Sequence, residues 1–280
     1  MKKQLASLIL RSFAYTLAIL LVYILLNSML SGSVWNGMTV SKSALTNEYC
    51  EFNNASKFFH QSINTYSNLV YFFFGIFICQ IGWSDFKNVN PNASNRLETF
   101  PLLSLLMGIC FIYLSFGSAF FHASLTWAGQ RVDMNGTYSI SICLLLIGFY
   151  CVFYKITFSE RQQIQIIFVA LLFILCFYQI HLLVSSSVLL PIFILAVWLL
   201  IAINFFQFRR ERSLILALSS IISIIVALKI RTLDVAKIGC DPYSIYQGHA
   251  VWHFLAGLSS FCSYAFFRFK IYFQTKLNNT

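Results

Sequence analysis

Eight long apolar runs constrain this chain more than any other feature of its sequence. Each run is long enough, or nearly so, to cross a bilayer as a helix, which takes about 20 apolar residues. The runs cover residues 12–30, 67–83, 100–122, 135–154, 164–180, 184–206, 213–230 and 248–267. Only 10% of the 280 residues are charged, against roughly 25% in ordinary soluble domains. The sequence therefore predicts an all-α, polytopic membrane helix bundle and excludes a water-soluble fold.

The first apolar run follows Lys2, Lys3 and Arg11, a charged start that is also typical of a signal peptide. However, its apolar stretch exceeds the roughly 7–15 residues of a signal-peptide core, and no Ala-x-Ala cleavage site follows it. An uncleaved helix is therefore favoured over a cleaved signal peptide. We expect an N-terminal anchor helix over residues 1–34 and a membrane domain over residues 35–280.

The distribution of Lys and Arg predicts the orientation of the bundle. If the N-terminus is inside, 13 of the 19 Lys and Arg residues fall in inner segments. The six in outer segments are Lys42, Lys57, Arg131, Lys229, Arg231 and Lys237. Because positive residues are enriched on the cytoplasmic side, both termini are expected in the cytoplasm.

Although the net charge is +10, the basic residues lie between apolar runs and form no patch, so nucleic-acid binding is not expected.

Three histidines reach the outer membrane face in this topology. His249 and His253 are four residues apart, which places both imidazoles on one helix face, and His122 closes the third run. Three imidazoles leave one position of a zinc ion open for water, as in catalytic sites. Zinc is favoured over copper or iron because no Cys, Met or carboxylate motif accompanies them. The sequence thus predicts a zinc centre facing the non-cytosolic side. His60 and His181 are expected to be interfacial and receive no role.

Two further polar residues accompany this predicted centre. Ser118 lies one turn before His122, and Asp133 opens the fourth run at the same face. The serine could hydrogen-bond an oxygen at the metal, and the aspartate could orient or deprotonate a water that the metal activates. Plainer interpretations stay open for both residues. Ser118 could be a small residue at a helix contact, and Asp133 could cap a helix N-terminus.

The eight cysteines divide into two groups. Six lie within apolar runs, where thiols pack as small hydrophobic groups. Cys50 and Cys240 instead fall in outer segments, where the compartment permits a disulfide. We expect these two to form a bridge that ties the segment before the second run to the loop before the last one. The alternative is a pair of free thiols.

Three stretches, taken together, resemble the alkaline ceramidases. These belong to a superfamily of seven-helix membrane hydrolases that includes adiponectin-receptor-like and Per1-like proteins. The stretches span residues 48–253 and read EYCEFN with the later NTYSN, GSAFFHASL with Gln130 and Asp133, and HAVWH. The resemblance implies that the last seven apolar runs form a seven-helix core and that 12–30 is an extra N-terminal transmembrane helix. It also implies that His122, His249 and His253 are zinc ligands and that Ser118 and Asp133 are their catalytic partners.

The segment before the second run offers oxygen atoms of the kind that a hard cation binds, although a solvated surface segment is the plainer interpretation. The resemblance implies a calcium site here, formed by Glu48, Glu51, Asn53 and the Tyr49 carbonyl. The sequence departs from the family at this point. The family typically has Asp and Trp where Glu48 and Tyr49 stand, and an acidic ligand where this chain has Gln61, with one residue fewer between. Losing a carboxylate should weaken calcium binding.

These observations predict a zinc-dependent lipid amide hydrolase embedded in the bilayer. Its substrate is expected to be ceramide or a similar N-acyl lipid, which it would cleave to a fatty acid and a long-chain amine. One alternative is a lipid-binding receptor or structural protein in which zinc only staples helices, a role that needs neither Ser118 nor Asp133. The other is a hydrolase that cleaves an ester during lipid remodelling. The oligomeric state is not indicated by the sequence.

Overall fold

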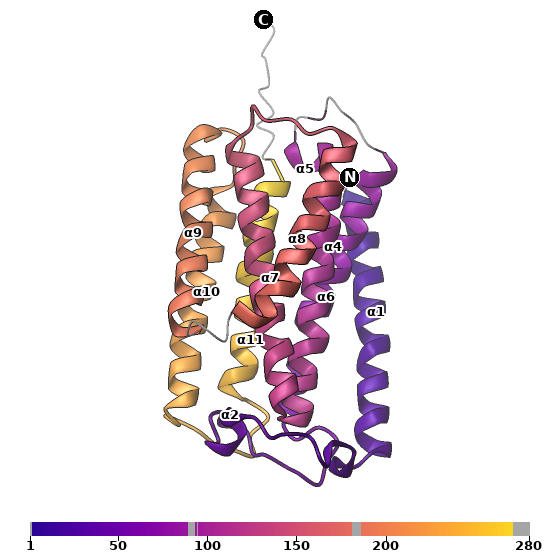
Figure 1. The fold of residues 1–280 in the computed structure, drawn as a ribbon, viewed down its shortest axis with the longest axis vertical. Coiled ribbons are helices and arrows are strands. Elements are labelled where there is room, and N and C mark those ends of the chain that lie inside the picture. The colour runs from indigo at the N-terminus through magenta and orange to yellow at the C-terminus, as the bar shows by residue number, and fades with distance from the viewer. Residues whose placement is uncertain (1, 89–92, 94, 181–185, 271–280) are drawn as a thin grey trace, which may run out of the picture.

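A computed structural model of the protein describes residues 2–88, 93, 95–180 and 186–270. Within these ranges the chain forms helices and no strand, and eight helices are long and apolar enough to cross a membrane. Figure 1 shows these helices lying side by side along the long axis of the molecule. The predicted all-α polytopic bundle is confirmed.

The spanning helices are α1 (Lys2–Met29), α4 (Leu69–Lys87), α6 (Pro101–Ser124), α7 (Trp127–Val152), α8 (Glu160–Ile180), α9 (Ser186–Gln207), α10 (Leu214–Val235) and α11 (Gly248–Arg268). Short helices lie between them: η1 (Gly32–Trp35), α2 (Lys42–Leu45), α3 (Ser62–Ser67) and α5 (Arg96–Thr99). Local sequence accounts for individual ends. Pro101, for example, occupies the first turn of α6, where its missing N–H has no intrahelical partner to lose.

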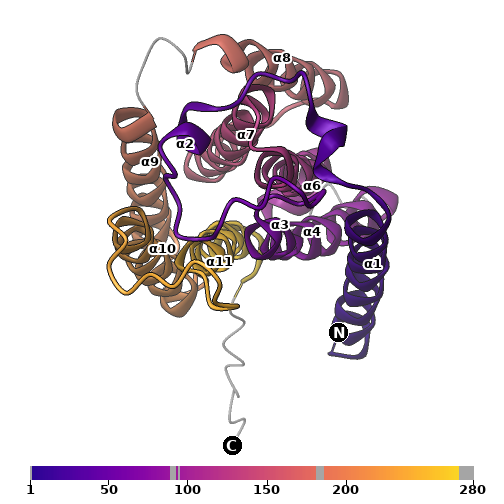
Figure 2. The same ribbon diagram turned by 90° about the horizontal axis from the view of Figure 1, so that it is seen from below.

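Helix α1 lies at the outside of the bundle, next to α4 (Figure 2). The side-chain amide of Gln80 on α4 donates to the Ser12 hydroxyl on α1 at 2.7 Å. The start of α1 and the end of α11 lie at the same end of the bundle (Figure 1). An even number of spans requires this arrangement.

Helix α7 begins earlier than its apolar run indicates. The run was expected from residue 135, whereas the helix starts at Trp127, after a turn formed only by Leu125 and Thr126. Leu125 is left-handed with a φ of 52°, and the Thr126 hydroxyl accepts from the Gly129 N–H at 3.2 Å as an N-cap. The cap stabilises a polar first turn that hydropathy alone does not detect. Asp133 therefore lies inside α7, and the interpretation of this residue as a helix cap is wrong.

Small residues allow α6 and α7 to pack closely. A Cβ atom added to Gly136 of α7 would lie 2.9 Å from the Cα of Leu114 on α6. One added to Gly117 of α6 would lie 2.9 Å from the Val132 side chain on α7. Helices in membranes commonly associate through such small residues, because packing substitutes for the hydrophobic effect there. This contact fixes the two helices that carry the candidate residues His122, Ser118 and Asp133.

The segment over residues 30–61 runs round one end of the bundle, from α1 past α7 and α8 to α2 and back to α3 (Figure 2). Backbone hydrogen bonds tie it to the turn between α6 and α7. The Ser41 N–H donates to the Leu125 carbonyl at 2.9 Å, and the Trp127 N–H donates to the Thr39 carbonyl at 2.8 Å. The Gln61 N–H donates to the His122 carbonyl at 3.0 Å. We call residues 30–61 the outer segment.

A disulfide joins Cys50 of the outer segment to Cys240 in the loop between α10 and α11, with a Cα–Cα distance of 5.7 Å. The predicted pairing is confirmed. The remaining six cysteines are free. The bridge therefore fastens the outer segment to the loop that precedes α11.

Loss of the bridge is expected to destabilise the protein by about 2–4 kcal/mol, because it closes a loop with a sequence separation of 190 residues. Cys50→Ser and Cys240→Ser should lower the midpoint of thermal unfolding in detergent equally, and the double variant should lower it no further. Cys176→Ser, at an exposed free cysteine on α8, is the matched control and should leave the midpoint unchanged. Additive losses in the double variant would contradict the pairing.

Candidate metal centre

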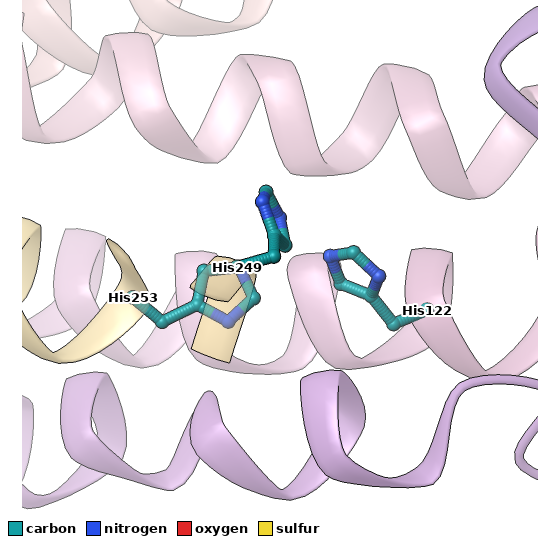
Figure 3. Close-up of side chains that lie close together, drawn as sticks. All are labelled: His122, His249 and His253. Carbon is teal, nitrogen blue, oxygen red and sulfur yellow. The ribbon is translucent and has the colours of Figure 1, made fainter. Parts of the chain in front are cut away.

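The three predicted ligands converge at the end of the bundle that the outer segment covers. His122 comes from α6, and His249 and His253 come from the first turns of α11. One ligand atom from each ring lies within 4.8 Å of the others, and all three residues are buried. Figure 3 shows the three rings close together, and their centroids form a triangle with sides of 4.9, 5.1 and 4.6 Å. Among the described residues, no other group of three or more His, Cys, Asp or Glu is placed in this way.

Gln61 determines which nitrogen of His122 is free. Its amide nitrogen donates to the Asn53 side-chain oxygen at 2.7 Å, so its Oε1 faces the ring. That oxygen lies 2.7 Å from Nδ1 of His122 and can only accept. Nδ1 therefore carries the proton, and Nε2 keeps its lone pair. Second-shell contacts of this kind fix the tautomer and orientation of metal-binding imidazoles.

Ser67 does the same for His253. Its hydroxyl donates to the Asn64 carbonyl at 2.8 Å, so it must accept from the ring nitrogen that it meets. That nitrogen is Nδ1 of His253, at 2.7 Å. The Nε2 lone pair of His253 is consequently free as well. Gln61, the residue before α3, and Ser67, the last residue of α3, thus fix the protonated nitrogen in two of the three imidazoles.

Asp234 holds the start of α11 in position. One of its carboxylate oxygens accepts from the His249 backbone N–H at 3.2 Å, and the other accepts from the Cys50 N–H at 3.2 Å. Gln247, the residue before α11, provides no side-chain cap, so the carboxylate supplies the negative partner that a helix N-terminus favours. Gly248 permits the approach, because a Cβ there would lie 2.9 Å from the Asp234 oxygen.

The donor set fits a zinc ion. Within the described part of the chain, Nε2 of His122 and Nδ1 of His249 are buried without a hydrogen-bond partner. Buried polar atoms are bonded in the great majority of cases, so two such nitrogens in one cluster call for a shared partner. Neutral imidazole nitrogens are ordinary zinc ligands, and three of them leave one coordination position open.

Ser118 and Asp133 lie at the same end of the bundle as the histidines, near the end of α6 and in the first turns of α7. Ser118 is buried on α6, and its hydroxyl lies near the Asp133 carboxylate on α7. Asp133 acts electrostatically on Tyr49 and Tyr71. The centroid of the Tyr49 ring lies 3.9 Å from that of His249, and the Tyr71 centroid lies 6.1 Å from that of His253. Each tyrosine therefore lies close to a histidine and within the electrostatic reach of Asp133.

Several residues of the site were not assigned these roles from the sequence. The sequence presents Gln61 only at the position of a missing acidic calcium ligand, and Ser67 only as part of a family motif. Arg231 on α10 was counted only for topology, yet its guanidinium lies 3.3 Å from Glu48 and acts electrostatically on Asp133. No spacing rule could have found these contacts, because they join side chains that are far apart along the chain. His60 lies outside the histidine cluster, and His181 lies outside the described residues.

The family model described as Ceramidase matches residues 41–280. The chain belongs to the ceramidase family. Membership implies a hydrolase that acts on the N-acyl amide bond of ceramide, so the protein is a membrane-embedded lipid amide hydrolase. A comparison with curated proteins found no match. The resemblance to alkaline ceramidases drawn from the sequence is thus confirmed at the level of the family.

The residues predicted to bind calcium in this ceramidase-family protein all accept hydrogen bonds from other parts of the chain. Glu48 accepts from Arg231, and the Tyr49 carbonyl accepts from the Lys237 ammonium. Both carboxylate oxygens of Glu51 accept from backbone N–H groups at the start of α3, at 2.7 and 2.8 Å. Burial nevertheless raises the pKa of Glu51 to about 7. The Asn53 side-chain oxygen accepts from Gln61. Each residue predicted to bind calcium therefore already has a hydrogen-bond donor from the chain, and two of these donors are cationic side chains.

Protein purified without chelators is expected to retain one equivalent of zinc, because three buried imidazoles from two helices are prepared for it. His122→Ala, His249→Ala and His253→Ala should each purify without the metal when measured by inductively coupled plasma mass spectrometry. His60→Ala is the matched control and should retain it, since this histidine lies outside the cluster. Full zinc content in any of the three cluster variants would contradict the assignment.

Proposed function

We propose that the protein is a zinc-dependent hydrolase of ceramide or a closely similar N-acyl lipid, which releases a fatty acid and a long-chain amine. One observation carries the proposal: three buried imidazoles share one end of the bundle with the Ser118–Asp133 pair. A zinc ion that only stapled helices together would need neither of these two residues. Family membership supports the amide bond as the one that is cleaved.

Each residue has a distinct part in the proposed reaction. The three histidines would hold a zinc ion, which would act as a Lewis acid toward the carbonyl oxygen and would lower the pKa of a bound water. Asp133 accepts a proton from the attacking water and later delivers it to the departing nitrogen. Ser118 donates a hydrogen bond to the carbonyl oxygen as it gains charge. The C–N bond breaks, the water oxygen stays in the fatty acid, and the proton leaves on the amine.

A small cavity supports the proposed position of the lipid tail. It has a volume of about 50 Å³ and lies between α7, α9, α10 and α11, with Leu144, Phe193, Val197 and Ser259 in its lining. Ser259 lies six residues after His253 on α11, which corresponds to about 9 Å along the helix at roughly 1.5 Å per residue. The cavity therefore lies deeper in the bundle than the histidines. We infer that it marks the path of the acyl chain.

This cavity is too small for an acyl chain as it stands, since its volume of about 50 Å³ admits only a few water molecules at roughly 10–15 Å³ each. Helices must therefore separate when substrate enters. Helix α9 packs chiefly on α7, and α10 packs chiefly on α11, whereas α9 and α10 contact each other little. We infer that substrate enters sideways from the bilayer between α9 and α10.

A larger cavity of about 280 Å³ lies near Arg268 at the opposite end of α11, away from the histidines.

The proposal is tested with fluorescent ceramide and purified protein in detergent. His122→Ala and His249→Ala should abolish release of the labelled fatty acid. Asp133→Asn should slow it by about 10²–10⁴-fold, and Ser118→Ala by about 10²–10³-fold. The matched control is Ser139→Ala, at a buried serine of α7 whose hydroxyl donates to the Gly136 carbonyl of its own helix, and its activity should be unchanged. Full activity in either histidine variant would overturn the mechanism.

The same preparation separates the alternatives. A receptor or a structural protein would bind ceramide with no turnover, whether loaded with zinc or treated with chelator. An ester-cleaving enzyme would hydrolyse a matched ester lipid faster than the amide. We expect amide cleavage that chelation abolishes and zinc restores. Turnover of the ester alone would reject the amide assignment while leaving the metal centre intact.

We also propose that the histidine end of the bundle faces the non-cytosolic side and that both termini are cytoplasmic. The support is the excess of Lys and Arg in the inner segments, 13 against 6. The Cys50–Cys240 disulfide at the histidine end agrees with an oxidising compartment. Green fluorescent protein fused to the C-terminus should therefore fluoresce, whereas alkaline phosphatase fused there should stay inactive. The opposite pattern would reverse the orientation.

A further inference from the structure

The outer segment is held by a hydrogen-bond donor and an acceptor from elsewhere in the chain. Its Tyr49 carbonyl accepts from the ammonium of Lys237, and the neighbouring Cys50 N–H donates to Asp234. Both Lys237 and Asp234 lie at the end of α10, on a different element from the segment that they bind. Lys237 also interacts electrostatically with the carboxylates of Glu48 and Asp234. A positive charge thus already lies among the oxygens to which a divalent cation would be attracted.

The backbone at Lys237 is unusual in a way that directs this side chain. Lys237 has a φ of 58°, in the left-handed region. Its N–H donates to the Asp234 carbonyl and the Ile238 N–H donates to the Leu233 carbonyl, both at 3.0 Å, which ends α10 in a Schellman motif. Glycine is the usual residue at this position, and another residue costs about 1–2 kcal/mol. A lysine at a position that favours glycine indicates that its side chain has a role.

Gln61 connects the outer segment with the metal centre. Its side chain is buried, donates to Asn53 and accepts from both Asn64 and His122. All of these contacts are neutral, so the amide completes the network without an added charge. A carboxylate at residue 61 would leave the Asn53 oxygen without its donor and would add a negative charge, which a bound cation would then have to balance.

We propose that the Lys237 ammonium takes the place of a divalent cation in the outer segment, and that the Gln61 amide transmits this order to His122. The outer segment is then independent of calcium, and Lys237 and Gln61 are positioning residues for the metal centre. The proposal deepens the zinc assignment but does not require the chain to hydrolyse any particular lipid. A calcium ion would have to approach an ammonium that already holds the Tyr49 carbonyl, against direct charge repulsion.

Thermal unfolding of the purified full-length protein tests the first half of the proposal. The midpoint of the wild-type protein should be the same in calcium chloride and in EGTA. Lys237→Met should lower it in both, and Lys237→Arg should restore most of the loss because it keeps the charge. The matched control is Lys229→Met, at an exposed lysine of α10, and it should have no effect. A saturable rise with calcium in the wild-type protein, removed by Glu51→Gln, would overturn the proposal, as would an unaltered midpoint in Lys237→Met.

A gain-of-dependence variant sharpens this test. In Lys237→Met/Gln61→Glu the ammonium is lost and a carboxylate is added, so the outer segment becomes more negative by two charges. We expect calcium to raise the unfolding midpoint of this double variant in a saturable manner and to leave the wild-type midpoint unchanged. Equal responses of the two proteins to calcium would contradict the exchange of ammonium for cation.

Zinc release measures the second half without any assay of activity. Protein loaded with zinc is mixed with a chromophoric chelator, and the rate of metal transfer is followed. Gln61→Leu removes the acceptor for His122 and should weaken zinc affinity by about 10–100-fold, as loss of such partners commonly does. Gln61→Glu keeps an acceptor and should retain zinc. Unchanged release from Gln61→Leu would overturn the positioning role, whereas a protein that holds zinc in this way but cleaves no ceramide would refute only the proposed function.

Discussion

The arrangement of this end of the bundle depends on which groups bind the ring nitrogens of its buried histidines. A ring nitrogen without a partner is costly there, and every histidine has two nitrogens to satisfy. In His122 and His253 one nitrogen bonds to the protein, through Gln61 and Ser67, and the other is left facing the cluster. A metal ion is the partner that can serve three such rings at once. The outer segment and α3 are needed because they carry the two hydrogen-bond acceptors.

A segment of irregular structure can hold acceptors in place only if it is itself fixed. The outer segment is fastened at separate points: to the α6–α7 turn by backbone hydrogen bonds, and to the α10–α11 loop by the Cys50–Cys240 disulfide. Asp234 adds a third connection, since one carboxylate binds both the Cys50 and His249 N–H groups. Together, these contacts join α6, α10 and α11 at the histidine end of the bundle. The three histidines are therefore held by the same contacts that close this end of the bundle.

The sequence predicted those features that depend on one local pattern. Apolar length identified all eight spans, i, i+4 spacing paired His249 with His253, and the shared face added His122. The start of α7 was missed because its first turns are polar and are stabilised by the Thr126 cap and by packing on α6. The contact between Gln61 and His122 joins residues 61 positions apart in the sequence. It depends on the path of a loop, which neither hydropathy nor periodicity describes.

The depth of the metal centre suits the chemistry of an N-acyl lipid. His249 is the second residue of α11, and His253 lies about 6 Å further into the helix, at roughly 1.5 Å per residue. His122 occupies the corresponding level near the end of α6. The amide of such a lipid lies where its polar head meets its apolar chains, close to the end of a spanning helix and far from the middle of a hydrocarbon core about 30 Å thick. The cavity beside Ser259 continues inward from this level, in the direction that an acyl chain would take. In the proposed function, one helix thus sets both the depth of the chemistry and the path of the acyl chain.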